Sequence, residues 1–278
     1  MKFMVVWSEG ELKMVKVMYL NPLAHKSAHD ELFVQMARDY KLPGTEVHIA
    51  SLPDDVGGFS HIEYRSYEGM VTGAIIRATR AAAREGFDAL AIGCFYDTAL
   101  AEAQEISGDM IVTAPCLASC EIAASLSNYF GVIVGRRKWV NQMRATVHAL
   151  GHRDRLSGFY HVDLGVTEFQ ADHERTERRL IEAGRKAVEQ DHAEALILGC
   201  TMEVGFYKQL EEELGVPVID PSIAALKRAE YSALLKRDCG WKPSRRWSCE
   251  APPEEEINQI GVFDSEPAFG GRIIVHAN

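Results

Sequence analysis

The sequence predicts an α/β protein with two similar lobes, each built on a parallel sheet and related by an approximate two-fold axis. Short β-branched runs alternate with longer amphipathic segments, which is typical of parallel sheets with helices on both faces. The strand-like runs are almost continuously apolar, as expected when both faces of a sheet are covered. One strand motif also occurs twice, which indicates an internal repeat.

Strands and helices are expected in alternation along most of the chain. The apolar runs predict strands at 15–20, 45–50, 88–93, 110–113, 131–134, 156–162, 195–199 and 216–219. Helical spacing of apolar residues predicts helices at 30–40, 67–85, 138–150, 173–190, 202–214 and 222–236. The last of these helices is expected to pack back on the first lobe.

The repeated motif defines the two lobes. DALAIGC at 88–94 and EALILGC at 194–200 each contain an acidic residue, Ala-Leu, two apolar residues and Gly-Cys. Each follows an Arg-containing helical segment. We therefore expect a first lobe of residues 1–120 plus 221–238 and a second lobe of 121–220. Residues 239–278, rich in Pro, Gly and charge, predict an irregular extension that is a subunit arm, a flap near the site or a loose tail.

Composition limits the possible partners. The 278 residues are 47% hydrophobic and carry a formal net charge of −10, which disfavours nucleic acid and anionic membrane surfaces. The first residues show no signal-peptide pattern, and no run approaches the ~18 apolar residues of a membrane span. The expected location is cytoplasmic, where six cysteines are thiols, metal ligands or catalytic groups rather than a disulfide framework.

Cys94 and Cys200 are the main candidates for chemistry. Each follows a glycine at the predicted end of a buried strand, where open α/β sheets bind ligands. A helix beginning there lowers the pKa of a thiol below its free value of about 8.5. If the lobes face each other, one thiolate removes a proton from an acidic substrate carbon and the opposite thiol returns one, without a cofactor. The backbone N–H groups expected to stabilise the enolate are those of Phe95, Tyr96, Thr201 and Met202.

The alternative for this pair is two buried cysteines that pack as small hydrophobes. A zinc site is disfavoured, because neither cysteine has a Cys-x-x-Cys partner or a suitable His cluster. No metal site and no cofactor are therefore predicted.

Polar residues after other strands are further candidates for binding a small-molecule substrate. Asn21 and Ser27 follow the first predicted strand, on the expected cleft side, and loop capping is the alternative. Ser119 and Cys120 follow the short strand at 110–113 and could line the pocket. Capping of the next helix explains Ser119 equally well.

Four sequence motifs together resemble one known family. They are NP at 21–22, AIGCFYD at 91–97, LILGCT at 196–201 and GVPVIDPSIAALKRAE at 215–230. In these the chain resembles the aspartate/glutamate/hydantoin racemase superfamily, and within it the hydantoin (allantoin) racemase branch. The resemblance implies two flavodoxin-like lobes with the active site in the cleft between them, frequently in homo-oligomers. It also implies Cys94 and Cys200 as the acid/base pair, no pyridoxal phosphate, and 5-substituted hydantoins as substrates.

Two other functions stay open on the sequence alone. One is a cis–trans isomerase or a lyase/decarboxylase of the same superfamily, acting on a small dicarboxylate, with Cys94 as the nucleophile of the isomerase. The other is a non-catalytic protein whose two lobes close on a ligand. The loop at 21–27 departs from the family pattern of Asn-Pro-Asn followed by Thr and Ser.

Overall fold

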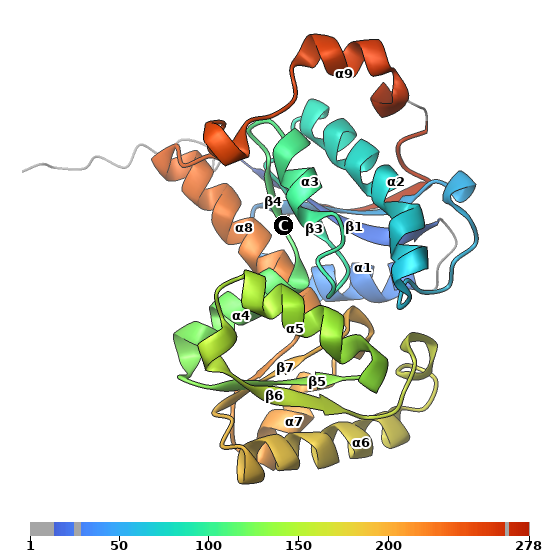
Figure 1. The fold of residues 1–278 in the computed structure, drawn as a ribbon. Coiled ribbons are helices and arrows are strands. Elements are labelled where there is room, and N and C mark those ends of the chain that lie inside the picture. The colour runs from blue at the N-terminus through green and yellow to red at the C-terminus, as the bar shows by residue number, and fades with distance from the viewer. Residues whose placement is uncertain (1–13, 25–28, 265–266, 278) are drawn as a thin grey trace, which may run out of the picture.

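The computed structural model describes residues 14–24, 29–264 and 267–277. It contains two separate sheets, one above the other in Figure 1, with helices on both faces of each. The alternation of strands and helices that the sequence predicts is confirmed. Ser27, a predicted substrate contact, lies outside the described residues.

The first sheet has the strand order β4-β3-β1-β2-β9. Its parallel strands are β1 (Val15–Ala24), β2 (Thr45–Leu52), β3 (Ala89–Ile92) and β4 (Ile111–Thr113). Helices α2 (Arg65–Arg84) and α3 (Leu100–Ile106) pack on one side, and α1 (His29–Tyr40) packs on the other. Alternate β1 side chains enter two different core clusters, so both faces of this sheet are buried.

The second sheet is entirely parallel, with the order β6-β5-β7-β8. Its strands are β5 (Phe130–Val134), β6 (Leu156–His161), β7 (Ala195–Leu198) and β8 (Val218–Ile219). Figure 1 shows α4 (Pro115–Leu126) and α5 (Val140–Ala149) above this sheet, and α6 (His173–Arg185) and α7 (Tyr207–Leu214) below it.

Helix α8 (Pro221–Cys239) joins the two sheets. It packs on β1, β3 and β4 of the first sheet, as predicted for the final helix, and also on α4. One core cluster therefore runs continuously from the first sheet into the second. The lobe boundary predicted between residues 120 and 121 falls inside α4, and the division into lobes stays a prediction.

The C-terminal segment is not irregular throughout, contrary to the prediction. It forms α9 (Glu254–Ile260) and β9 (Gly271–Val275), and β9 pairs antiparallel with the outer edge of β2. Glu254 accepts two hydrogen bonds from Arg80, of 2.5 and 3.1 Å, which fixes α9 against α2 (Figure 1). Periodicity did not reveal these elements because they are short and their contacts lie far away along the chain.

Within the described residues, no helix is both long enough and apolar enough to cross a bilayer.

Candidate active site

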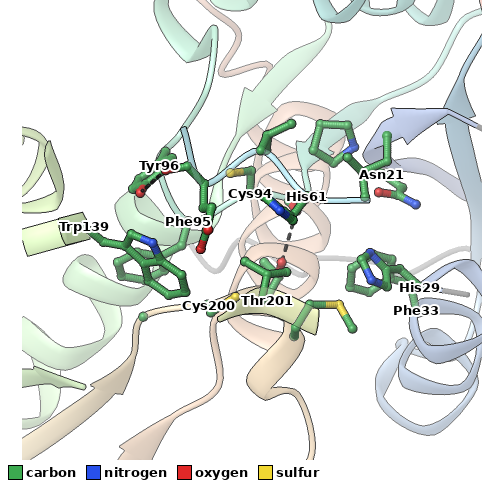
Figure 2. A pocket seen from close by; sticks show the side chains of 18 of the residues that line it. Asn21, His29, Phe33, His61, Cys94, Phe95, Tyr96, Trp139, Cys200 and Thr201 are labelled. Carbon is green, nitrogen blue, oxygen red and sulfur yellow. Dashed lines mark hydrogen bonds between the residues drawn. The ribbon is translucent and has the colours of Figure 1, made fainter. Parts of the chain in front are cut away.

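A pocket lies where strands of the two sheets end opposite each other. It encloses about 510 Å³ of space, including its open mouth. Figure 2 shows Cys94 and Cys200 on opposite sides of this pocket. Cys94 follows β3 of the first sheet, and Cys200 follows β7 of the second. Of the substrate-binding residues predicted from the sequence, those that line the pocket are Asn21, Phe95, Tyr96, Thr201 and Met202.

The glycine before each cysteine is required by close backbone contact. The N–H of Gly93 donates to Leu20 O at 2.8 Å, and the N–H of Gly199 donates to Ile133 O at 2.7 Å. A β-carbon on Gly93 would lie 3.0 Å from the same Leu20 oxygen, and one on Gly199 only 2.5 Å from the Ile133 oxygen. The repeated Gly-Cys therefore places both thiols by the same packing arrangement.

Each cysteine sulfur receives a backbone hydrogen bond from the residue two positions later. Cys94 is bonded by the N–H of Tyr96, and Cys200 by the N–H of Met202. Both bonds favour the thiolate form. These two N–H groups were predicted to stabilise an enolate oxygen; in the structure they serve the sulfurs instead.

The pKa values of both thiols are raised, so the predicted lowering is wrong. Burial raises the pKa of Cys94 to about 12, although the Tyr96 N–H and the Thr98 hydroxyl act in the opposite direction. Burial also holds the pKa of Cys200 well above its usual range, and the carboxyl of Glu203 adds to this effect. The expected helix dipoles are missing because α3 starts only at Leu100 and a single 3₁₀ turn, Thr201–Glu203, follows Cys200.

The two strand ends are tied directly to each other. The Thr201 hydroxyl donates a hydrogen bond of 3.2 Å to the carbonyl oxygen of Gly93, shown as the dashed line in Figure 2. Thr201 lies in the turn after β7 of the second sheet, and Gly93 directly follows β3 of the first sheet. This bond therefore fixes the spacing of the two Gly-Cys turns.

Asp97 caps α4, a helix whose bounds were not predicted from the sequence. Its carboxylate oxygens accept the N–H groups of Cys116 and Leu117, both at 2.8 Å, at the start of α4. Burial nevertheless raises the pKa of Asp97 to about 7. Asp97 therefore links the turn after Cys94 to the start of α4.

Glu203 lies directly behind Cys200. The backbone N–H of Cys200 donates to Glu203 Oε2 at 3.0 Å, and the Glu203 side chain is fully buried. Burial raises the pKa of this carboxyl well above its usual range, although the Cys200 N–H acts in the opposite direction. A buried carboxyl group therefore holds the backbone of this cysteine in place.

Ser119 and Cys120 do not line the pocket, contrary to the prediction. Both lie on α4, which packs against α8, and 0% of the surface of either residue is exposed. The helix begins at Pro115, immediately after the short strand β4, and its rotation carries these two side chains into the core.

Several residues that line the pocket were not predicted from the sequence. His61 and Glu63 come from the loop before α2, and Trp139 comes from the turn before α5. Phe33 lies on α1, where its apolar spacing predicted only a core position. Loop residues such as His61 and Glu63 carry no periodic signal, so tertiary structure alone brings them to the pocket.

The pocket is mainly apolar, and the described residues that line it include neither Lys nor Arg. Glu63 lines it and forms an ion pair of 2.7 Å with Arg136, which is not a lining residue. Across the described parts of the chain, no cluster of three or more His, Cys, Asp or Glu residues is suited to hold a metal ion.

The fold corresponds to that of known racemases. The structure of allantoin racemase from Klebsiella pneumoniae matches with a TM-score of 0.77 and 25% identity, over 86% of this chain and 94% of that one. A family model described as Asp/Glu/Hydantoin racemase matches residues 20–229. This chain therefore belongs to the Asp/Glu/hydantoin racemase family, and it is an isomerase of the racemase type.

Two relatives support the same assignment. The hydantoin racemase of Paenarthrobacter aurescens is 30% identical over 243 residues, which covers 87% of this chain and 99% of the relative. The hydantoin racemase of Pseudomonas sp. (strain NS671) is 32% identical over 203 residues, which covers 73% of this chain and 77% of the relative.

Proposed function

We propose that this racemase inverts the configuration at C5 of 5-substituted hydantoins, with Cys94 and Cys200 as the two proton-transfer groups. The observation that carries the proposal is the presence of both thiols on opposite sides of one small pocket (Figure 2). The relatives that are hydantoin racemases, and the similar structure of an allantoin racemase, support the hydantoin ring as substrate class.

The proposed reaction is a two-base proton transfer. One thiolate takes the C5 proton, and the C5–H electron pair moves into the ring to form an enolate at the C4 oxygen. The opposite thiol then gives its proton to the other face of C5, and the enolate electrons return to carbon. The product has inverted configuration, the first cysteine ends as a thiol and the second as a thiolate.

The raised pKa values suit this chemistry. A thiolate whose conjugate acid has a high pKa is a strong base, which a carbon acid requires, although it is present in a small fraction of molecules at neutral pH. The backbone N–H bonds from Tyr96 and Met202 stabilise that form when it appears. The N–H groups of Phe95 and Thr201 remain our candidates for hydrogen bonding to the enolate oxygen.

Pocket charge favours a neutral ring over a dicarboxylate. Two carboxylates need cationic partners when they leave water, but the described lining residues include neither Lys nor Arg. Glu63 is the acidic residue in the lining, and it is already paired with Arg136. This lining disfavours the alternative of an isomerase or decarboxylase that acts on dicarboxylates. Mass spectrometry of the trapped enzyme tests the isomerase, because attack by Cys94 on the substrate would leave a covalent adduct.

The proposal is tested with pure L- and D-hydantoins in D2O. We expect the optical rotation to be lost and deuterium to appear at C5 of the product. This should hold for at least one class of hydantoin, with a small or an aromatic substituent. Cys94→Ser and Cys200→Ser should each reduce kcat/KM by about 10² to 10⁴, the usual contribution of a general acid or base. Cys239→Ser is the matched control, because this exposed thiol on α8 lies outside the pocket and should keep full activity.

Two results would contradict the proposal. If no hydantoin loses rotation or takes up deuterium, the hydantoin assignment is wrong. If either cysteine variant retains wild-type kcat/KM, the two-base mechanism is wrong even if racemisation occurs.

Two further proposals concern the protein as a whole. We propose that it forms homo-oligomers, which light scattering of the purified protein tests, and that it is cytoplasmic, which cell fractionation tests.

A further inference from the structure

Thr98 lies between Cys94 and a second acidic group. Its hydroxyl oxygen is 3.6 Å from Cys94 Sγ and 3.0 Å from Glu68 Oε1. The Thr98 residue is only 2% exposed, so these contacts are made inside the protein. Glu68 comes from the first turn of α2, which is 30 residues earlier in the chain.

One hydroxyl proton cannot serve both contacts at once. When Thr98 donates to the Glu68 carboxylate, its oxygen is left to accept the S–H of Cys94. When Cys94 is a thiolate, Thr98 donates a hydrogen bond to the sulfur, and its oxygen accepts a hydrogen bond from a neutral Glu68 carboxyl. The three groups therefore have two complete hydrogen-bonded arrangements that differ by the position of one proton.

Glu68 connects this chain of groups to the protein surface. The residue is half-buried, whereas Thr98 is buried. Its other oxygen, Oε2, accepts a hydrogen bond of 2.5 Å from Gln142 Nε2 on α5, which holds the carboxylate in place from the side of the second sheet. Among these three groups, Glu68 thus combines a fixed position, a carboxyl group and contact with solvent.

We propose that Thr98 and Glu68 form a proton relay that exchanges the Cys94 proton with solvent while a substrate fills the pocket. In the outward step, the Cys94 S–H proton moves to the Thr98 oxygen as the Thr98 O–H proton moves to Glu68. This leaves a thiolate, an unchanged hydroxyl and a neutral carboxyl that releases its proton to water. The reverse steps reload the thiol. The inference rests on the proposed role of Cys94 in racemisation.

Cys200 has a different environment. The acidic group behind it, Glu203, is fully buried and accepts the backbone N–H of Cys200. The adjacent Thr201 hydroxyl donates to Gly93 O. Because neither contact leads to an exposed acid, the relay predicts fast exchange at one cysteine and slow exchange at the other with substrate bound.

The difference in exchange between the two cysteines should be visible as deuterium in the unreacted substrate during racemisation in D2O. The enantiomer deprotonated by Cys94 should gain deuterium without inversion, because the abstracted proton is exchanged before it returns. The opposite enantiomer, deprotonated by Cys200, should remain unlabelled until it inverts. Mass spectrometry of each enantiomer after chiral separation, in the first tenth of the reaction, gives the ratio of deuterium in residual substrate to deuterium in product.

Three variants test the relay through this ratio. Thr98→Val keeps the shape but removes the hydroxyl, and should lower the ratio for the Cys94 enantiomer by about tenfold or more. Glu68→Gln should act in the same direction, since an amide does not accept and release the proton. Thr98→Ser retains the hydroxyl and should behave as wild type. Equal labelling of both residual enantiomers by wild type, or an unchanged ratio in Thr98→Val, overturns the relay.

A second measurement separates this inference from the proposed function. Failure of wild type to racemise or label any hydantoin refutes the function, and alkylation of Cys94 by iodoacetamide then decides the inference. The modified peptide is quantified against pH. Loss of the hydroxyl donor in Thr98→Val should slow alkylation and move its midpoint to higher pH, whereas Thr98→Ser should not. Identical profiles for wild type and Thr98→Val would overturn the Thr98 contact on which the relay depends.

Discussion

Gly199→Ala perturbs the packing that places Cys200. The new β-carbon would lie 2.5 Å from Ile133 O and 2.8 Å from Val134 Cγ1, whereas ordinary contacts start at 3.4 Å. Strands β5 and β7 would have to separate locally by about 0.9 Å, at the site of the 2.7 Å hydrogen bond from Gly199 to Ile133. Overpacking costs about 1–3 kcal/mol and the weakened hydrogen bond about 1 kcal/mol, so we expect a loss of about 2–4 kcal/mol in the free energy of unfolding.

The same shift should impair catalysis. A displacement of the reacting group by about 1 Å reduces the rate by roughly 100-fold, and Cys200 follows the altered backbone directly. Urea unfolding followed by circular dichroism measures stability, and polarimetry of a hydantoin measures kcat.

Gly69→Ala in α2 is the matched control. Apart from its chain neighbours and the nearby backbone of α2, no atom lies within 4 Å of the place that its new β-carbon would occupy. Alanine should therefore stabilise the helix by about 0.5–1 kcal/mol. A Gly199→Ala protein with the wild-type urea midpoint and the wild-type kcat would refute the packing argument.

Three other perturbations have defined outcomes. Burial raises the pKa of Asp97 to about 7, so the proton on this carboxyl stabilises the folded state fully below about pH 4, and this contribution is lost as the pH rises through 7. The side chain introduced by Asp97→Asn does not titrate. In urea unfolding, the free energy of unfolding of this variant relative to wild type should therefore rise by up to about 4 kcal/mol between pH 4 and 8. A difference that stays constant with pH would contradict this. Because burial raises the pKa of Cys94 to about 12, kcat/KM should rise about tenfold per unit from pH 6 to 8, and a flat profile would contradict a buried neutral thiol. Removal of residues 241–278 should lower the urea midpoint and promote aggregation by exposing the β2 edge, yet preserve kcat per folded molecule, because no described pocket residue lies in that segment.

The repeated Gly-Cys motif made the centre of the site predictable. A buried strand that ends in glycine has few possible surroundings in an open α/β sheet, so the motif indicated both the strand end and the position of the thiol. The environment of the sulfur was not predictable in the same way. The pKa of Cys94 depends on burial by residues from distant segments, and on a turn, rather than a helix, between Cys94 and Leu100.

The remaining differences have a common physical origin. Ser119 and Cys120 were assigned from their distance after a strand, but the phase of a helix decides which side chains face a pocket. His61 and Trp139 reach the pocket from irregular segments. Strand β9 pairs with a partner more than 200 residues earlier in the chain, so its five residues carried no local indication of the contact.

The pairing of β9 with β2 determines when this protein can complete its fold during synthesis. Every described strand of the second sheet lies between residues 130 and 219, so this sheet can assemble before α8 and β9 have left the ribosome. The first sheet lacks its covering helix α8 and its edge strand β9 until both have left the ribosome. We therefore expect the usual N-terminal-first order of folding to be reversed on the ribosome, with the earliest-made strands the last to be protected from association with other nascent chains.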